Sequence, residues 1–192
     1  QFHLSASDFS SDLGQEIEAD HFAAELLMPE EVLRAEIRRH PIGREAIKNM
    51  AVRFATSLTS TAIRYAQLTV DPVAVVVSEG DAVCYCFASP TLANIRGIFL
   101  RKGSPVPKGT TTARFNADPQ NVLAAAEADG LLYLSEWFDD PAKDFEISED
   151  VIGLGRYGKT LTVLHASQIP DENDEDEDDP EHFNPDGKRY AW

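Results

Sequence analysis

Residues 16–29 predict an amphipathic helix that turns a carboxylate toward its own apolar face. At about 3.6 residues per turn, five apolar side chains share a face about 140° wide, which is the usual width of a core-facing stripe. They are Ala19, Phe22, Ala23, Leu26 and Leu27. Glu16 falls inside this face, Asp20 lies at its edge one turn later, and Glu18 lies on the opposite flank.

A carboxylate that points into a core needs a metal ion, a cation or hydrogen-bond donors, because unpaired burial costs several kcal/mol. One interpretation of Glu16 is therefore a metal ligand or one member of a buried pair. The other is a carboxylate in the first turn of a helix, where it interacts favourably with the helix dipole. The helical pattern alone leaves both interpretations open.

The sequence of residues 16–29, E-I-E-A-D-H-F-A-A-E-L-L-M-P, resembles the signature segment of the ImmA/IrrE family of bacterial and phage zinc metallopeptidases. In that family an H-E-x-x-H helix supplies two zinc ligands and the general base, and a glutamate on a following helix supplies the third ligand. The E-x-x-x-D spacing is also similar to the third-ligand helix of thermolysin-like enzymes. The resemblance implies that Glu16 binds zinc, with Glu18 as the alternative, and that Asp20 orients a ligand histidine.

The H-E-x-x-H motif itself is absent from this sequence. None of the five histidines has a second histidine four residues later, the spacing that places two imidazoles on one helix face. Gln1 to Leu4 resemble the end of the family's catalytic helix, with glutamine at the position of the second histidine. We therefore expect a fragment of a longer protein. By itself it would bind no zinc tightly, would carry no catalytic residue and would be inactive, because one carboxylate is too small a ligand set.

Composition indicates a folded protein without a membrane span. The chain has 192 residues, of which 43% are hydrophobic, and no run approaches 18 apolar residues. No secretory signal is visible at its start. Cys84 and Cys86 form a C-Y-C sequence, and on a strand both side chains would point to the same side. We interpret them as reduced, buried thiols, which predicts a cytoplasmic protein.

The net charge of −16 is concentrated near the end of the chain. Residues 171–181 hold nine acidic side chains and no basic one. Because like charges repel and cannot bury apolar area, we predict that residues 169–192 form a disordered acidic tail. The alternative is a segment that mimics nucleic acid or contacts a basic surface, which for an ordered tail would be the helices from Arg34 to Arg53.

Residues 29–68 predict three further helices. Pro29 suits the first turn of one helix, whose apolar face would be Val32, Leu33 and Ile37, and residues 40–43 break it. A helix over residues 46–54 and one over 57–66, with Ser57 or Thr59 as its N-cap, together resemble a helix-turn-helix. Residues 30–64 hold seven basic and four acidic side chains, so DNA binding is a weak prediction.

From Pro72 the pattern changes to strands. Residues 73–78 and 82–88 predict a hairpin around the turn at 79–81. Further strands are expected at 98–100, 131–138, 145–147 and 159–166. Asp118 and Pro119 are a helix-start signal for a short helix over Val122 to Ala128, which Gly130 would end. The family's second domain is a GAF-like sensor fold, and this order agrees with it. Candidate ligand-binding side chains in this domain are Tyr85, Phe87, Trp137, Arg156 and Tyr157, although core or surface packing is the interpretation that we favour for each.

These observations predict an α+β protein with three parts. Residues 1–70 would be the helical C-terminal part of a zincin-like peptidase domain with a helix-turn-helix-like pair. Residues 71–168 would be a GAF-like antiparallel sheet domain, and 169–192 the acidic tail. The resemblance implies a zinc endopeptidase that cleaves a DNA-binding repressor in a stress or mobile-element response. The alternative is a non-catalytic regulator of the same fold that binds its repressor without cleaving it.

Overall fold

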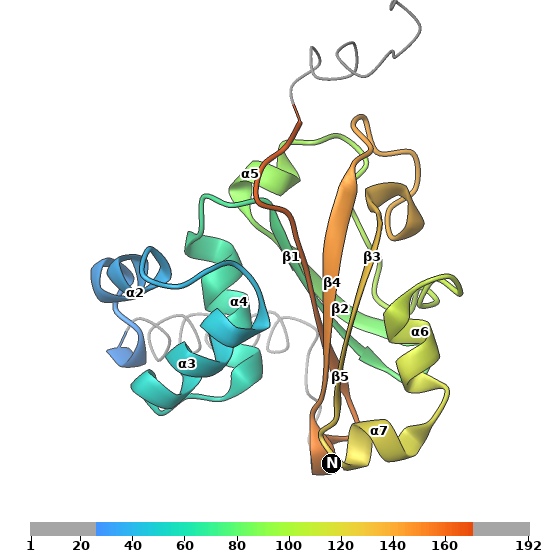
Figure 1. The fold of residues 1–192 in the computed structure, drawn as a ribbon, viewed down its shortest axis with the longest axis horizontal. Coiled ribbons are helices and arrows are strands. Elements are labelled where there is room, and N and C mark those ends of the chain that lie inside the picture. Colours follow the sequence, from blue (N-terminus) through green and yellow to red (C-terminus); the bar gives the residue numbers. More distant parts are fainter. Residues whose placement is uncertain (1–25, 171–192) are drawn as a thin grey trace, which may run out of the picture.

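A computed structural model describes residues 26–170 of the chain (Figure 1). Three helices come first and a five-stranded sheet follows, with short helices between its strands. The helices are α2 (Glu30–Ile37), α3 (Arg44–Phe54), α4 (Leu58–Leu68), α5 (Pro90–Ala93), α6 (Thr111–Asn116) and α7 (Pro119–Leu123). The strands are β1 (Val73–Glu79), β2 (Ala82–Ala88), β3 (Glu127–Tyr133), β4 (Glu146–Gly153) and β5 (Thr160–His165), with single turns of 3₁₀ helix at Leu134–Glu136 and Gly155–Tyr157.

The sheet is open and antiparallel throughout. Its strand order is β2-β1-β5-β4-β3, so β2 and β3 form its two edges. The central strand β5 pairs with β1, where Val73 lies opposite His165, and with β4, where Ser148 lies opposite the same histidine. The predicted α+β class and the antiparallel sheet are therefore confirmed.

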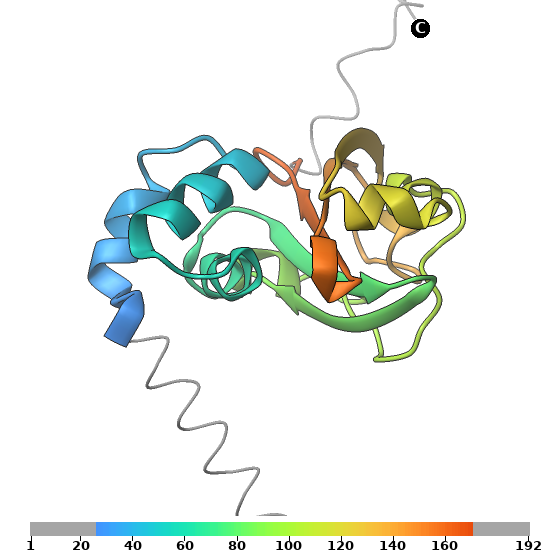
Figure 2. The same cartoon turned by 90° about the horizontal axis from the view of Figure 1, so that it is seen from below.

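Helices α2, α3 and α4 cover one face of the sheet, where α4 packs directly on β1 and β2. Figure 2 shows these helices on one side of the strands and α6 and α7 on the other. Apolar side chains of both layers form one continuous core. Its fully buried members include Met28, Leu33, Ile47, Met50, Tyr65, Val73, Val75, Val77, Leu161 and Val163. The predicted boundary between residues 70 and 71 thus lies within a shared core, and the division into domains stays a prediction.

The opposite face of the sheet packs on a second apolar cluster. Long loops and the short helix α5 supply much of it, and Trp137 and Phe138 are buried at its centre. A smaller cluster under α6 and α7 joins Phe115, Val122 and Val151. The sheet is thus covered on this face by short helices and loops.

The predicted helix ends at residues 40–57 are confirmed. Gly43 precedes α3 with φ of +115°, a conformation that favours glycine. The Ala55 residue ends α3 in the left-handed region, and the Ser57 side chain caps α4 by accepting a hydrogen bond from the Ser60 N–H. Helices α3 and α4 therefore meet through a short turn, as the helix-turn-helix-like pattern predicted.

The prediction that Cys84 and Cys86 point to the same side is wrong. The pairing of β1 with β2 shifts between Val77 and Ser78, which leaves Cys84 as an extra residue in a β-bulge. Cys84 packs against the helix-side core and Cys86 against the opposite core. Both thiols are free, as predicted, and both are half-buried.

Two other predictions fail between the hairpin and β3. No strand forms at residues 98–100; the chain there is a loop that leads to α6, a helix that the sequence did not predict. The predicted helix at 122–128 ends at Leu123, and Gly130 lies inside β3, where a side chain would collide with Thr111. Packing against α6 therefore selects glycine at this position, and the turn interpretation was wrong.

Three apolar side chains that were predicted to be buried are exposed. Leu26 is 68% exposed, Leu27 55% and Val32 46%. Leu33 and Ile37 face the core as predicted, and Met28 faces it too. Because Val32 is exposed, the apolar face of α2 is narrower than the sequence pattern indicated.

The predictions for Glu16, Glu18 and Asp20, and for the acidic tail beyond residue 170, lie outside the described residues. Of the helices within residues 26–170, none is long and apolar enough to cross a membrane.

Candidate functional site

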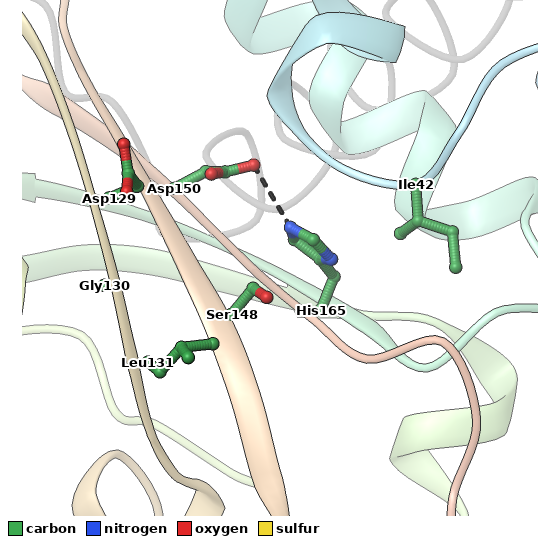
Figure 3. Close-up of a pocket in the computed structure, with 7 residues that line it drawn as sticks. All are labelled: Ile42, Asp129, Gly130, Leu131, Ser148, Asp150 and His165. Carbon is green, nitrogen blue, oxygen red and sulfur yellow. Dashed lines mark hydrogen bonds and ion pairs between the residues drawn. The ribbon is translucent and has the colours of Figure 1, made fainter.

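On the face of the sheet that α2–α4 cover, part of the sheet extends beyond these helices. A cavity of about 570 Å³ lies there, over β3, β4 and the end of β5 (Figure 3). A second hollow of about 310 Å³ adjoins it and shares Leu131, Ser148 and His165 with it. We call the first cavity the sheet groove; its lining consists of Ile42, Asp129, Gly130, Leu131, Ser148, Asp150 and His165.

Strand register explains why polar side chains gather in the sheet groove. Alternate residues of a strand share a face, and directly paired residues of neighbouring strands share it too. Ser148 and Asp150 therefore lie on the same side of β4, with Leu131 and Asp129 opposite them on β3. The groove is open because the helical layer packs on β1 and β2 through α4 and leaves the middle of β3 uncovered, where Leu131 is 67% exposed.

Asp150 and His165 form the only ion pair among the residues that line the groove. The Asp150 Oδ2 atom lies 3.1 Å from His165 Nε2, and Figure 3 shows the two side chains pointing toward each other. The same oxygen accepts a hydrogen bond of 2.9 Å from the Arg44 backbone N–H. Burial alone would raise the pKa of Asp150, but the hydrogen bonds from His165 and Arg44, together with their charges, lower it below its usual range.

Arg44 connects the helices to the groove's rim. Its guanidinium donates to the Ala128 carbonyl at 2.8 Å and lies 3.3 Å from Asp129 and 3.4 Å from Glu127. Lys48, one turn later on α3, pairs with the same Glu127 at 2.8 Å. The first turns of α3 are thereby fastened to the edge strand β3.

Gly43 closes the groove at its helical end. A side chain at this position would place Cβ 2.7 Å from Asp150 Oδ2 and 2.8 Å from His165 Nε2. Only glycine therefore lets the loop before α3 approach the pair while its φ is positive.

The groove combines a carboxylate–imidazole pair with other groups that can contact a ligand. A carboxylate that holds an imidazole is a common proton-transfer pair. Nucleophilic catalysis would also require a hydroxyl that is hydrogen-bonded to the imidazole. Ser148 faces His165 across the strands but, within the described part of the chain, forms no hydrogen bond with it. The groove offers an imidazole, two carboxylates and the apolar Leu131 and Ile42 to a ligand.

A second buried carboxylate has a structural role. Glu149 is fully buried on the other side of β4 and accepts three hydrogen bonds: from the Thr111 N–H at 2.7 Å, the Thr112 N–H at 2.9 Å and the Thr112 hydroxyl at 2.6 Å. These donors form the start of α6, where a negative charge is favourable. Glu149 therefore fixes α6 on the sheet.

The five predicted ligand-binding side chains do not form one site. Tyr85 and Phe87 stack edge-to-face, 5.8 Å apart, against the helix-side core. Trp137 is buried in the opposite core, and the Arg156 guanidinium lies 5.4 Å from the Tyr157 ring at the surface. Packing explains each of them, which is the alternative that the sequence left open.

Sequence reasoning missed the Asp150–His165 pair. The available signal was two polar side chains, Ser148 and Asp150, alternating with apolar ones in a strand, followed by a histidine at the end of the next strand. Their meeting depends on the β4–β5 register, which the sequence does not display. Across residues 26–170, no group of three histidine, cysteine or acidic side chains is arranged to hold a metal ion.

Comparison with known proteins does not place the chain in a family. No family model matches it, and no curated protein matches it.

Proposed function

We propose that this chain is part of a zinc-dependent endopeptidase of the ImmA/IrrE type, which cleaves a DNA-binding transcriptional repressor in a stress or mobile-element response. The observation that carries the proposal is the sequence of residues 16–29, which resembles the family's signature segment in residue type and spacing. Glu16 is the proposed zinc ligand, with Glu18 as the alternative, and Asp20 is the proposed partner of a ligand histidine.

The end of that segment supports the proposal because it is built into the core. Met28 is 1% exposed, packs with α2–α4 and lies 3.7 Å from the Thr56 hydroxyl. Pro29 then leads directly into α2. On this proposal, α2–α4 form the C-terminal part of a zincin-like peptidase domain, and the exposed Leu26 and Leu27 contact other parts of that domain.

The antiparallel sheet supports a sensor role for the rest of the chain. On this proposal it is a GAF-like domain, and the sheet groove is where it holds a ligand. The free thiols of Cys84 and Cys86 agree with a cytoplasmic location, where thiols stay reduced.

The second candidate is a non-catalytic regulator that binds its repressor without cleaving it. The glutamine at position 1, where the family's second histidine would stand, favours it. Direct DNA binding through α3 and α4 has less support, because Arg44, Lys48 and Arg53 of α3 are engaged in ion pairs with carboxylates of the same chain.

The proposal is tested with the full-length protein, Zn²⁺ and helix-turn-helix repressors encoded in the same genome. Binding is measured by pull-down and cleavage by intact-mass spectrometry. We expect cleavage by the natural protein and by Glu18→Gln, and binding without cleavage by Glu16→Gln. The reverse pattern for the two variants would assign the zinc ligand to Glu18. Binding without cleavage by every form would select the regulator. A protein that neither binds nor cleaves any of these repressors would overturn both candidates.

A further inference from the structure

The basic side chains of the sheet part of the chain are concentrated in one stretch. Residues 82–117 hold five basic side chains and no acidic one, in a protein whose net charge is −16. Three of the five lie within residues 96–102, which connect α5 to the segment before α6. We call these residues, R-G-I-F-L-R-K, the basic loop.

The basic loop is held to the fold by its apolar residues and presents its charges outward. Ile98 and Leu100 pack against the core on the far face of the sheet. Between them Phe99 is 69% exposed, and Arg96, Arg101 and Lys102 are exposed too. The loop then meets edge strand β2, where the Gly103 N–H donates to the Val83 carbonyl.

The cations of the basic loop differ from those of the helices in having no ion pair among the described residues. Asp139 and Asp140 lie near the loop, because a Cβ added at Gly97 would be 3.2 Å and 2.7 Å from their backbone carbonyl oxygens. Neither carboxylate, however, is paired with Arg96, Arg101 or Lys102. In residues 30–54, by contrast, every basic side chain except Arg38 is paired with glutamate or aspartate; these are Arg34, Arg39, Arg44, Lys48 and Arg53. An acidic segment would therefore gain more at the basic loop than at the helices, where it would have to displace existing partners.

We propose that the acidic run of residues 171–181 docks on the basic loop. The charges are complementary, since nine carboxylates follow Pro170 directly. The last described residues, which precede the acidic run, also lie on the same side of the fold as the basic loop. Strand β5 finishes beside the start of β1 and α5 (Figure 1), and Ile169 packs against the same core as Ile98 and Leu100.

The acidic run is long enough to reach every cation of the loop. From Ala88, at the α5 end of β2, to Val83, where the loop ends, is about 17 Å at about 3.3 Å per strand residue. Eleven extended residues span up to about 37 Å. Contacts between exposed charges are screened by salt, so docking should weaken as the ionic strength rises. Phe99 adds an apolar contact for the stems of the acidic side chains.

Zero-length cross-linking of the full chain with a carbodiimide tests this proposal, because the reagent joins a lysine to a carboxylate only where the two are in contact. Products are identified by peptide mass spectrometry. The Lys48–Glu127 pair, at 2.8 Å, is an internal positive control. We expect Lys102 to couple to residues 171–181 at about 0.1 M salt and to lose most of this product at about 1 M salt, where the Debye length is about 3 Å.

Variants distinguish specific docking of the acidic run on the basic loop from random collisions of the run with surface lysines. Arg96→Glu with Arg101→Glu leaves Lys102 in place and should reduce its coupling several-fold, whereas Arg156→Glu, at another exposed site, should leave it unchanged. Equal coupling of the acidic run to Lys102, Lys143 and Lys159 would overturn the proposal. It would also be overturned if the intact chain bound duplex DNA through Arg96 and Arg101 with an affinity that did not change when the nine carboxylates were replaced by amides.

Discussion

Asp150 on β4 and His165 on β5 face each other across the sheet at 3.1 Å, and Gly43 before α3 lies against both. Three segments that are far apart in the sequence thus meet at one carboxylate oxygen. The contact fixes the position of the helices relative to the sheet and forms one wall of the sheet groove. Substitutions at these positions should therefore change both the sheet groove and the free energy of unfolding.

Gly43→Ala should be strongly destabilising. The added Cβ would lie 2.7 Å from Asp150 Oδ2, at a φ of +115° that alanine avoids. Strain and displacement of the pair together should lower the free energy of unfolding by about 2–4 kcal/mol. Urea denaturation measures this change.

Gly80→Ala is the matched control for that substitution. Gly80 also has a positive φ, of +57°, but nothing lies within 4 Å of the place that an added Cβ would take. Backbone strain alone should cost about 1 kcal/mol there. Equal losses for the two variants would show that contact with Asp150 and His165 does not matter at Gly43.

Asp150→Asn should lower the free energy of unfolding at neutral pH and change it little at low pH. The pKa of Asp150 is lowered in the folded protein, so its carboxylate contributes stability above the unfolded pKa of about 3.9. That contribution is lost as the pH falls through the lower, folded value. We expect the difference in unfolding free energy between the natural protein and the variant to narrow steadily below about pH 4.

Asp129→Asn provides the comparison on the same rim of the groove. Its side chain is 73% exposed, and its contact with Arg44 is one of several that this arginine makes. Exposed pairs contribute little, so its effect should stay within about 0.5 kcal/mol at every pH. An effect as large and as pH-dependent as that of Asp150→Asn would contradict the burial argument.

Glu149→Gln should destabilise the attachment of α6. The carboxylate is fully buried and accepts three hydrogen bonds from Thr111 and Thr112, whereas an amide offers one acceptor oxygen and brings two donors. Hydrogen bonds to a charged group contribute about 1.5–3 kcal/mol, so a loss of about 2 kcal/mol is expected. Glu146→Gln, on an exposed position of the same strand, should change the unfolding midpoint little.

The helices and the hairpin were predictable because their signals are local. The apolar spacing of Ala46, Ile47 and Met50, the break before Arg44 and the Ser57 cap all act within a few residues. The continuous apolar run of β1 followed by a glycine turn is equally local. None of these features needs information from elsewhere in the chain.

The features that were missed depend on distant residues. Helix α6 begins where Glu149 of β4 accepts from its first N–H groups, and Gly130 is a strand residue because Thr111 packs on it. The Asp150–His165 pair requires a strand register set by the whole sheet. The one-residue bulge at Cys84 moves the side chains of the rest of β2 to the opposite faces of the sheet, and no local sequence pattern predicts it.

Because of that bulge, the two cysteines have different environments. Alkylation of Cys86 can test its burial. Burial raises the pKa of Cys86 to about 12, so at pH 8 almost none of it is thiolate, the form that reacts. In the folded protein, iodoacetamide should modify Cys86 more than about a hundredfold more slowly than a free thiol of pKa about 8.5. The rate is measured by mass spectrometry on the Cys84→Ser variant, where Cys86 is the remaining cysteine. In urea the same thiol should react at the free rate. Rapid modification of Cys86 in the folded Cys84→Ser protein would mean that β2 does not hold it against the far core, and that the bulge is misplaced.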